Sequence, residues 1–306
     1  MRTLLTVLIA MAAVAAPPAA KKARTSIRIP VSADGPALTV RDVKASVDGD
    51  EARVSAVRAP GEDMILILVL DITGDLTLAD LARQALTAGI ESLPPKTWIS
   101  VMRAQDGLQV LVDPTNEHPK VAEAIRSYAV SGKAGLLDTI DTAARMSDAI
   151  LGKANVRLAV LYVTDSNIYN YREDFTNPVI NSSDSRDMSR HFPEGLVKDK
   201  ISKLDVGLAA TQSPIFIVHL DYRSDRLNEA YQSGLMKLAA TSGGAAVFCR
   251  STTDVGATVG RALESIGLLH SVTLELPRKV GKSFQVKLEA GDRQLSYRSR
   301  FSMEGR

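Results

Sequence analysis

The sequence predicts an α/β fold, in which a doubly wound, mostly parallel sheet is joined to a small β-sandwich. Apolar strand-like runs alternate with segments of helical periodicity over residues 62–268, a pattern typical of a parallel sheet covered by helices. The flanking segments, 24–61 and 270–303, contain only short strand-like runs. We therefore expect the two ends of the chain to pair into one β-domain.

The composition is that of an ordinary globular protein. The 306 residues include 37 Lys and Arg against 35 Asp and Glu, for a net charge of +2. This balance provides no basic surface of the kind that binds nucleic acid, so we expect no nucleic-acid partner. A single Cys excludes a disulfide framework and a cysteine-rich metal site.

The N-terminus, residues 1–20, is predicted to be a signal peptide. Arg2 provides a positive start, residues 4–14 are apolar, and small residues follow, with a cleavage position near Ala15. The apolar run is too short for a membrane span, which takes about 20 residues. We expect export to the periplasm or the extracellular space and no membrane insertion after cleavage.

The N-terminal β segment and the C-terminal β segment are read from alternating apolar and polar residues bounded by Gly, Asp and Pro. The predicted strands of the first are 26–31, 37–40, 43–49 and 52–57. Those of the second are 271–277, 284–290 and 295–301.

The α/β domain begins with an apolar run. MILILVL at 64–70 has no polar residue, which favours a strand buried on both faces of a parallel sheet. Apolar residues then recur at helical spacing from 78 to 90. Thr77 and Asp80 resemble a capping box at the start of this helix.

The rest of the α/β domain continues the alternation of strands and helices. Runs at 98–102 and 108–112 flank Asp106-Gly107, a strong hairpin signal. Further strands are predicted at 157–163, 214–220 and 245–249. Helices are predicted at 117–129, 136–151, 197–210, 227–241 and 254–268.

Acidic and hydroxyl side chains follow two of the predicted parallel strands. Asp71, Thr73 and Asp75 follow the first strand, and Asp165 follows the strand at 157–163. Ligands of doubly wound sheets bind at the carboxyl ends of the strands, so we expect these side chains to lie close together. Oxygen ligands of this kind suit a hard cation such as Mg²⁺ or Ca²⁺.

These residues resemble a von Willebrand factor type A (VWA) domain. In that family the metal-ion-dependent adhesion site combines D-x-S-x-S with a Thr from a middle loop and an Asp after a later strand. Residues 131–138 resemble the middle loop, and both ends of the chain resemble the bacterial secreted VWFA-related family of the acidobacterial type. The resemblance implies a VWA domain over 62–268 that binds proteins.

The resemblance also implies metal roles for Asp71, Thr73, Asp75 and Asp165. Asp75 puts a carboxylate where the family has a hydroxyl, and Ala134 stands where the family has the middle-loop Thr. The site is therefore either a modified site for Mg or Ca, or a degenerate one whose acidic residues cap helices. Both interpretations stay open from the sequence.

The sequence contains none of the enzyme signatures that this fold class commonly carries. There is no G-x-S-x-G elbow, no dinucleotide fingerprint after the first strand and no phosphate-binding loop. The four His residues show no metal-ligand spacing. We expect a protein that is not an enzyme.

A long polar insertion, 166–196, leaves the same sheet edge as Asp165. It carries Tyr169, Tyr171, Arg172 and Phe175, residue types that are common in interface hot spots, although a solvated surface loop has the same composition. The leading hypothesis is a secreted adhesion or scaffold module that binds a protein partner of unknown identity through this edge. The alternative is a metal-free structural or assembly component of the cell envelope.

Overall fold

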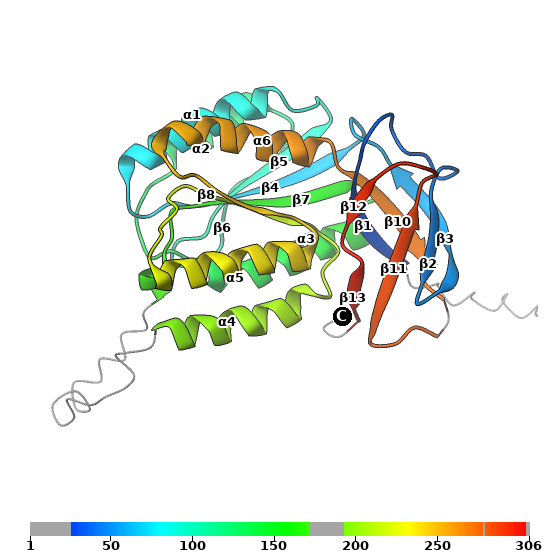
Figure 1. Cartoon of the computed structure of the whole chain (residues 1–306). Coiled ribbons are helices and arrows are strands. Elements are labelled where there is room, and N and C mark those ends of the chain that lie inside the picture. Colours follow the sequence, from blue (N-terminus) through cyan, green and yellow to red (C-terminus); the bar gives the residue numbers. More distant parts are fainter. Residues whose placement is uncertain (1–25, 172–192, 278, 304–306) are drawn as a thin grey trace, which may run out of the picture.

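The computed structural model describes residues 26–171, 193–277 and 279–303. An α/β domain and an antiparallel sheet lie end to end (Figure 1). The chain crosses from the antiparallel sheet to the α/β domain between Arg58 and Met64, and returns between Gly267 and His270. The predicted signal peptide lies outside the described residues.

The α/β sheet is doubly wound. In the described residues its strands are β4 (Met64–Asp71), β5 (Thr97–Arg103), β6 (Gln109–Thr115), β7 (Arg157–Thr164), β8 (Ile215–His219) and β9 (Ala246–Phe248). They lie in the order β6-β5-β4-β7-β8-β9. The neighbours are parallel, except that β6 runs antiparallel to β5 as the second strand of the predicted hairpin. The predicted mostly parallel α/β sheet is confirmed.

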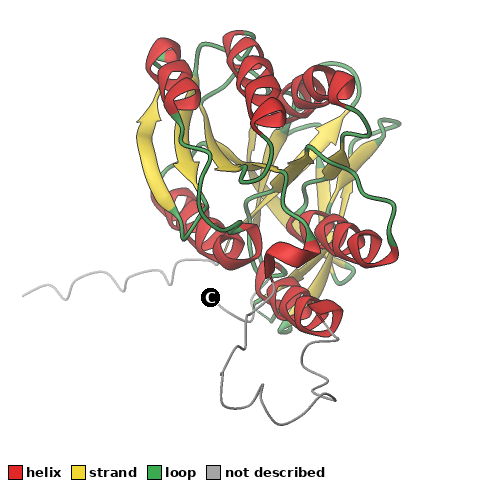
Figure 2. Ribbon diagram, turned by 90° about the vertical axis from the view of Figure 1, so that its left-hand side faces the viewer, coloured by secondary structure: helices red, strands yellow, loops and turns green. Residues whose placement is uncertain are grey.

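Helices cover both faces of the α/β sheet (Figures 1 and 2). One face carries α1 (Leu76–Glu91), α2 (His118–Ser127) and α6 (Val255–Gly267), and the other carries α3 (Leu136–Lys153), α4 (Pro193–Leu208) and α5 (Arg226–Ser242). None of the helices in the described ranges combines the length and the apolarity needed to cross a bilayer.

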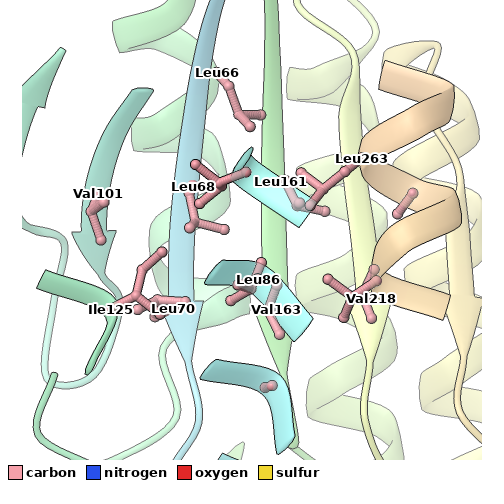
Figure 3. Packing of buried hydrophobic residues seen from close by; sticks show 14 of the residues in the cluster. Leu66, Leu68, Leu70, Leu86, Val101, Ile125, Leu161, Val163, Val218 and Leu263 are labelled. Carbon is pink, nitrogen blue, oxygen red and sulfur yellow. The ribbon is translucent and has the colours of Figure 1, made fainter. Parts of the chain in front are cut away.

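Strand β4 is buried on both faces, as its apolar run predicts. Leu66, Leu68 and Leu70 pack with Leu86 of α1 and Leu263 of α6 (Figure 3). The alternate residues of β4 belong to the core on the opposite face, against α3 and α5. This alternation follows from the period of two of a β-strand.

The antiparallel sheet interleaves the two ends of the chain. Its described strands are β1 (Ser26–Ala33), β2 (Lys44–Val47), β3 (Asp50–Arg58), β10 (His270–Glu275), β11 (Ser283–Glu289), β12 (Leu295–Tyr297) and β13 (Arg300–Ser302), in the order β12-β1-β10-β3-β2-β11-β13. The edge strands β12 and β13 are separated in the chain only by Arg298 and Ser299. The sheet therefore curls until its two edges meet, around a separate apolar core. The predicted pairing of the ends is present as this curled sheet, without a second sheet stacked on it in the described residues.

Two of the predicted strands differ in the structure. Residues 37–40 form no strand, because the Asp42 carboxylate accepts the N–H and the hydroxyl of Thr39, both at 2.7 Å, and closes a turn. The predicted strand at 295–301 is divided into β12 and β13. The break is at Arg298, which is buried and donates to the carbonyls of Ala209 (3.1 Å) and Thr211 (3.0 Å) beyond the end of α4.

The buried guanidinium of Arg157 binds both segments in which the chain passes between the two sheets. Arg157, at the start of β7, donates from Nη1 to the carbonyls of Gly267 and Leu269 and from Nη2 to the carbonyl of Glu62, each at 2.9 Å. Glu62 precedes β4, and Gly267 and Leu269 precede β10. One side chain therefore holds the exit and the return of the chain together.

Candidate functional site

The loops after β4, β7, β8 and β9 meet at one edge of the α/β sheet, which we call the rim (residues 71–75, 165–171, 220–225 and 249–252). The strand order reverses between β4 and β7, which is where doubly wound sheets bind their ligands. A pocket of about 420 Å³ opens there. Its polar lining includes Asp75, Asp165, Asn170, Asp221, Arg223 and Arg250.

Asp165 holds the loop after β4. Its Oδ1 accepts the N–H of Thr73 at 2.8 Å, and its Oδ2 accepts the N–H groups of Gly74 at 2.7 Å and Asp75 at 3.2 Å. A Cβ atom at position 74 would lie 3.2 Å from Oδ2, so the close approach favours glycine. The carboxylate is thus turned into the loop, where it stabilises three successive amides.

Asp71 caps the start of α3 from another part of the chain. Its Oδ1 accepts the N–H of Gly135 at 2.8 Å, and its Oδ2 accepts the N–H of Leu136 at 3.2 Å and the hydroxyl of Thr164 at 3.0 Å. These amides have no partner inside the helix, so a carboxylate stabilises them. Complete burial raises the pKa of Asp71 to about 7, although the hydrogen bonds act in the opposite direction.

Asp75 caps the start of α1. Its Oδ1 accepts the N–H groups of Thr77 at 2.7 Å and Leu78 at 3.3 Å. The capping residue is therefore Asp75, and the capping box predicted for Thr77 and Asp80 is wrong. A side-chain oxygen at the N-cap position satisfies the same free amides that the box would have bonded.

The predicted metal-binding residues lie together, but they fit a resident Mg²⁺ or Ca²⁺ poorly. Every carboxylate oxygen of Asp71 and Asp165 already accepts at least one backbone N–H. Ala134 is buried and directly precedes Gly135, which binds Asp71, and it offers a methyl group where the VWA pattern has a hydroxyl. In the described residues no three His, Cys, Asp or Glu side chains are grouped as metal ligands would be. A bound Ca²⁺ would need six to eight oxygen ligands.

A chain of buried hydroxyl groups lies below the rim. Thr164 Oγ1 and Ser166 Oγ lie 2.7 Å apart, and Ser166 Oγ lies 2.8 Å from the hydroxyl of Tyr231 on α5. The Ser166 carbonyl lies 2.6 Å from His219 Nε2. These contacts link the end of β7 to α5 and β8. Sequence reasoning missed them, and the only signal is that Ser166 directly follows Thr164-Asp165.

The predicted partner-binding residues separate in the structure. Tyr169, in a short 3₁₀ helix (η1, Ile168–Tyr171), is 40% exposed and lies at the surface beside the rim pocket. Tyr171 is buried, its hydroxyl accepts the N–H of Leu137 at 3.3 Å, and its ring packs against Tyr231. A direct contact between Tyr171 and a partner does not fit this position. Arg172 and Phe175 lie outside the described residues.

The rim also contains charged residues that the sequence analysis did not single out. Arg223 donates from Nε to the Asp221 carboxylate at 2.8 Å, and the guanidinium of Arg250 lies 5.2 Å from the ring centre of Tyr222. Each Arg comes shortly after an apolar strand. The rule that selected Asp71 and Asp165, a polar residue after a parallel strand, would have found both.

Comparison with known proteins returns only solved structures: no family model and no curated protein sequence matches the chain. A von Willebrand factor type A protein from Catenulispora acidiphila has 10% identity and a TM-score of 0.48, over 92% of this chain and 75% of that one. The vWF domain of a type V pilus tip protein from Porphyromonas gingivalis has 11% identity and a TM-score of 0.47, over 74% and 99%. The PilB minor pilin from Streptococcus sanguinis has 10% identity and a TM-score of 0.47, over 68% and 62%. The α/β half of the chain, with the D-x-T-x-D run that begins at the last residue of β4, is similar to von Willebrand factor type A domains.

Proposed function

We propose that this chain is an exported, non-enzymatic protein-binding module that contacts its partner through the rim and needs no divalent cation to do so. The observation that carries the proposal is that the rim combines loops fixed by hydrogen bonds with an open polar pocket. Asp71, Asp75 and Asp165 hold the loops from below, while the loops after β7, β8 and β9 present their own polar side chains to an open pocket.

The lining of the rim pocket suits a polar protein surface. It carries both signs of charge, with Arg223 and Arg250 beside Asp221 and Asp75. Mixed charges of this kind give specificity and steer association. Loops that are already held by hydrogen bonds lose little conformational freedom on binding, so more of the interaction energy remains as affinity.

Among the described residues near the rim, the positions of His219 and Cys249 support a role without catalysis. Burial lowers the pKa of His219, and its Nε2 is engaged with the Ser166 carbonyl. Cys249 is buried, and burial raises the pKa of its thiol, whereas a reactive cysteine needs a lowered pKa. These positions favour packing roles over catalysis.

Site-specific photo-crosslinking tests the proposal. The photoreactive amino acid p-benzoylphenylalanine replaces Tyr169 beside the rim pocket, or Trp98, which is 44% exposed near the start of β5, at the opposite end of the sheet. We expect a discrete covalent adduct with one protein from the producing cells at position 169 only, unchanged by a chelator. Identical adducts at both positions, or none at 169, would contradict binding at the rim.

Metal independence has a separate test. Calorimetric titration with MgCl₂ or CaCl₂ should give no saturable heat. A saturable heat that is lost in Thr73→Ala, which removes a hydroxyl oxygen and keeps all three carboxylates, would show that the rim binds a cation after all. If a chelator abolished the adduct formed by p-benzoylphenylalanine at position 169, the conclusion would be the same.

A further inference from the structure

A second cavity lies along the edge strand β9. This groove has a volume of about 860 Å³ and is lined by residues of α5, β9 and α6. Since α5 and α6 cover opposite faces of the sheet, the groove follows the sheet edge between them. Met236 and Val247, both exposed, and Phe248 give it an apolar lining.

Strand β9 leaves one side of its backbone without a partner. Ile217 of β8 donates its N–H to the Ala245 carbonyl at 2.9 Å, and Cys249 donates its N–H to the His219 carbonyl at 2.8 Å. In a parallel ladder, residues on the strand alternate between facing the neighbour and facing away. Positions 245, 247 and 249 therefore face β8.

The N–H and carbonyl groups of Ala246 and Phe248 consequently point into the groove. These residues are aligned with Ile217 and His219 of β8, whose backbone groups bond instead to Ala245 and Cys249. Within the described chain no group forms a hydrogen bond with these outward-facing atoms. Open edge groups of this kind are the template that β-strand addition uses in peptide recognition.

The charged side chains that line the groove have a net positive charge. Arg250 and Arg261 line it, and among the described residues neither takes part in an ion pair. Arg261 has only a long contact, 3.5 Å, with the Thr258 hydroxyl. Glu229 is the one acidic residue among the described lining residues. The groove therefore complements an apolar segment that carries carboxylates.

We propose that β9 receives an extended segment of a partner protein, in which Asp or Glu alternate with apolar residues, as an added strand of the α/β sheet. The backbone of Ala246 and Phe248 pairs with the segment, and Arg261 binds its carboxylates. The apolar side chains of the segment pack on Met236 and Val247. This surface shares only Arg250 with the rim pocket and does not depend on the rim binding a partner.

Selection from a phage-displayed library of random heptapeptides on the immobilised full chain provides the probe. Enriched peptides are synthesised with a fluorophore, and their binding is measured by fluorescence anisotropy. We expect sequences in which Asp or Glu alternate with apolar residues. Binding should weaken about tenfold or more in Ala246→Pro, which removes an edge N–H that the fold does not use, and in Arg261→Glu.

Two controls accompany these variants. Arg226→Glu changes a side chain that is 88% exposed on α5 outside the groove, and Arg223→Glu changes the rim, and both should bind the peptides as the unmodified chain does. Circular dichroism establishes that Ala246→Pro is folded. If Ala246→Pro proves to be unfolded, the proposal is tested by Arg261→Glu and by amide exchange in the unmodified chain. A bound peptide must slow exchange at Ala246 and Phe248 about tenfold or more.

Several results would overturn the proposal. These are a library that yields no enriched peptide, enriched peptides that bind Ala246→Pro or Arg261→Glu with full affinity, and unchanged amide exchange at Ala246 and Phe248. Concentration-dependent dimerisation that Ala246→Pro abolishes would assign the edge to a second copy of the chain. That result would also refute a partner segment as the occupant.

Discussion

Replacement of Arg157 by Met tests whether one buried side chain holds the two sheets together. Arg157 is only 2% exposed, and its donors satisfy the carbonyls of Glu62, Gly267 and Leu269. A buried carbonyl that loses its donor costs about 1–3 kcal/mol. Because Met fills much of the same volume, the loss of these hydrogen bonds dominates. Three carbonyls lose their donor, and the recovered cost of burying the guanidinium offsets part of this loss, so we expect the free energy of unfolding to fall by about 3–5 kcal/mol.

The assay is urea unfolding followed by circular dichroism, with Arg53→Met as the control. The Arg53 side chain is 72% exposed on β3, so its replacement should change the free energy of unfolding by less than about 0.5 kcal/mol. Since Arg157 joins the crossings between the sheets, its loss should also divide the transition into two steps. A loss below about 1 kcal/mol with a single transition would refute the reasoning.

The remaining predictions concern Asp165 of the rim, two glycines at the two ends of α3, and the buried His270. Asp165→Ala removes the acceptor of the Thr73, Gly74 and Asp75 amides, so amide exchange in this loop should accelerate and stability should fall by about 2–4 kcal/mol. In Gly135→Ala the new Cβ would lie 1.8 Å from the Ala104 carbonyl oxygen, and thermal unfolding should show a loss of about 3 kcal/mol or more. Gly152 lies inside α3, and a Cβ there would have no atom within 4 Å outside the helix backbone, so Gly152→Ala should stabilise by up to about 1 kcal/mol. Burial, and then Arg293 and Arg157, lower the pKa of His270, although its contact with the Val31 backbone opposes this. The unfolded chain therefore binds a proton first, and stability falls as the pH drops below the ordinary value of 6.5. The wild type should lose more stability than His270→Gln between pH 7.5 and 5.5 in urea titrations, and equal losses would contradict the assignment.

The arrangement of the strands could be predicted because the determining signals are local. The apolar run at 64–70 is long enough to identify a strand buried on both faces, and Asp106-Gly107 identifies the hairpin after β5. The convergence of Asp71 and Asp165 then follows from topology, since parallel strands bring their carboxyl ends to one edge. The positions of Asp71 and Asp165 could therefore be predicted without knowledge of any long-range side-chain contact.

The direction of each side chain could not be predicted, because it depends on backbone from distant parts of the chain. Asp71 turns to the amides of Gly135 and Leu136, more than sixty positions further on. The approach of Gly135 to the Ala104 carbonyl brings those amides within reach. Arg298 is similar: its alternating neighbours predict an unbroken strand, but the carbonyls beyond α4 draw the guanidinium into the interface.

The rim and the groove along β9 share Arg250, which lines both cavities. A substitution at Arg250 would therefore weaken binding at either surface and could not show which one a partner uses. Arg223 lines only the rim pocket and Arg261 only the groove, so substitutions at these two residues distinguish the two surfaces.

If one partner chain occupied both surfaces, the effects of Arg223→Glu and Arg261→Glu on its affinity would add in free energy, because the two sites have no lining residue in common except Arg250. If different partners occupied them, each substitution would affect one partner and leave the other unchanged. The double variant thus decides whether the sheet edge extends the binding surface of the rim or serves a second protein.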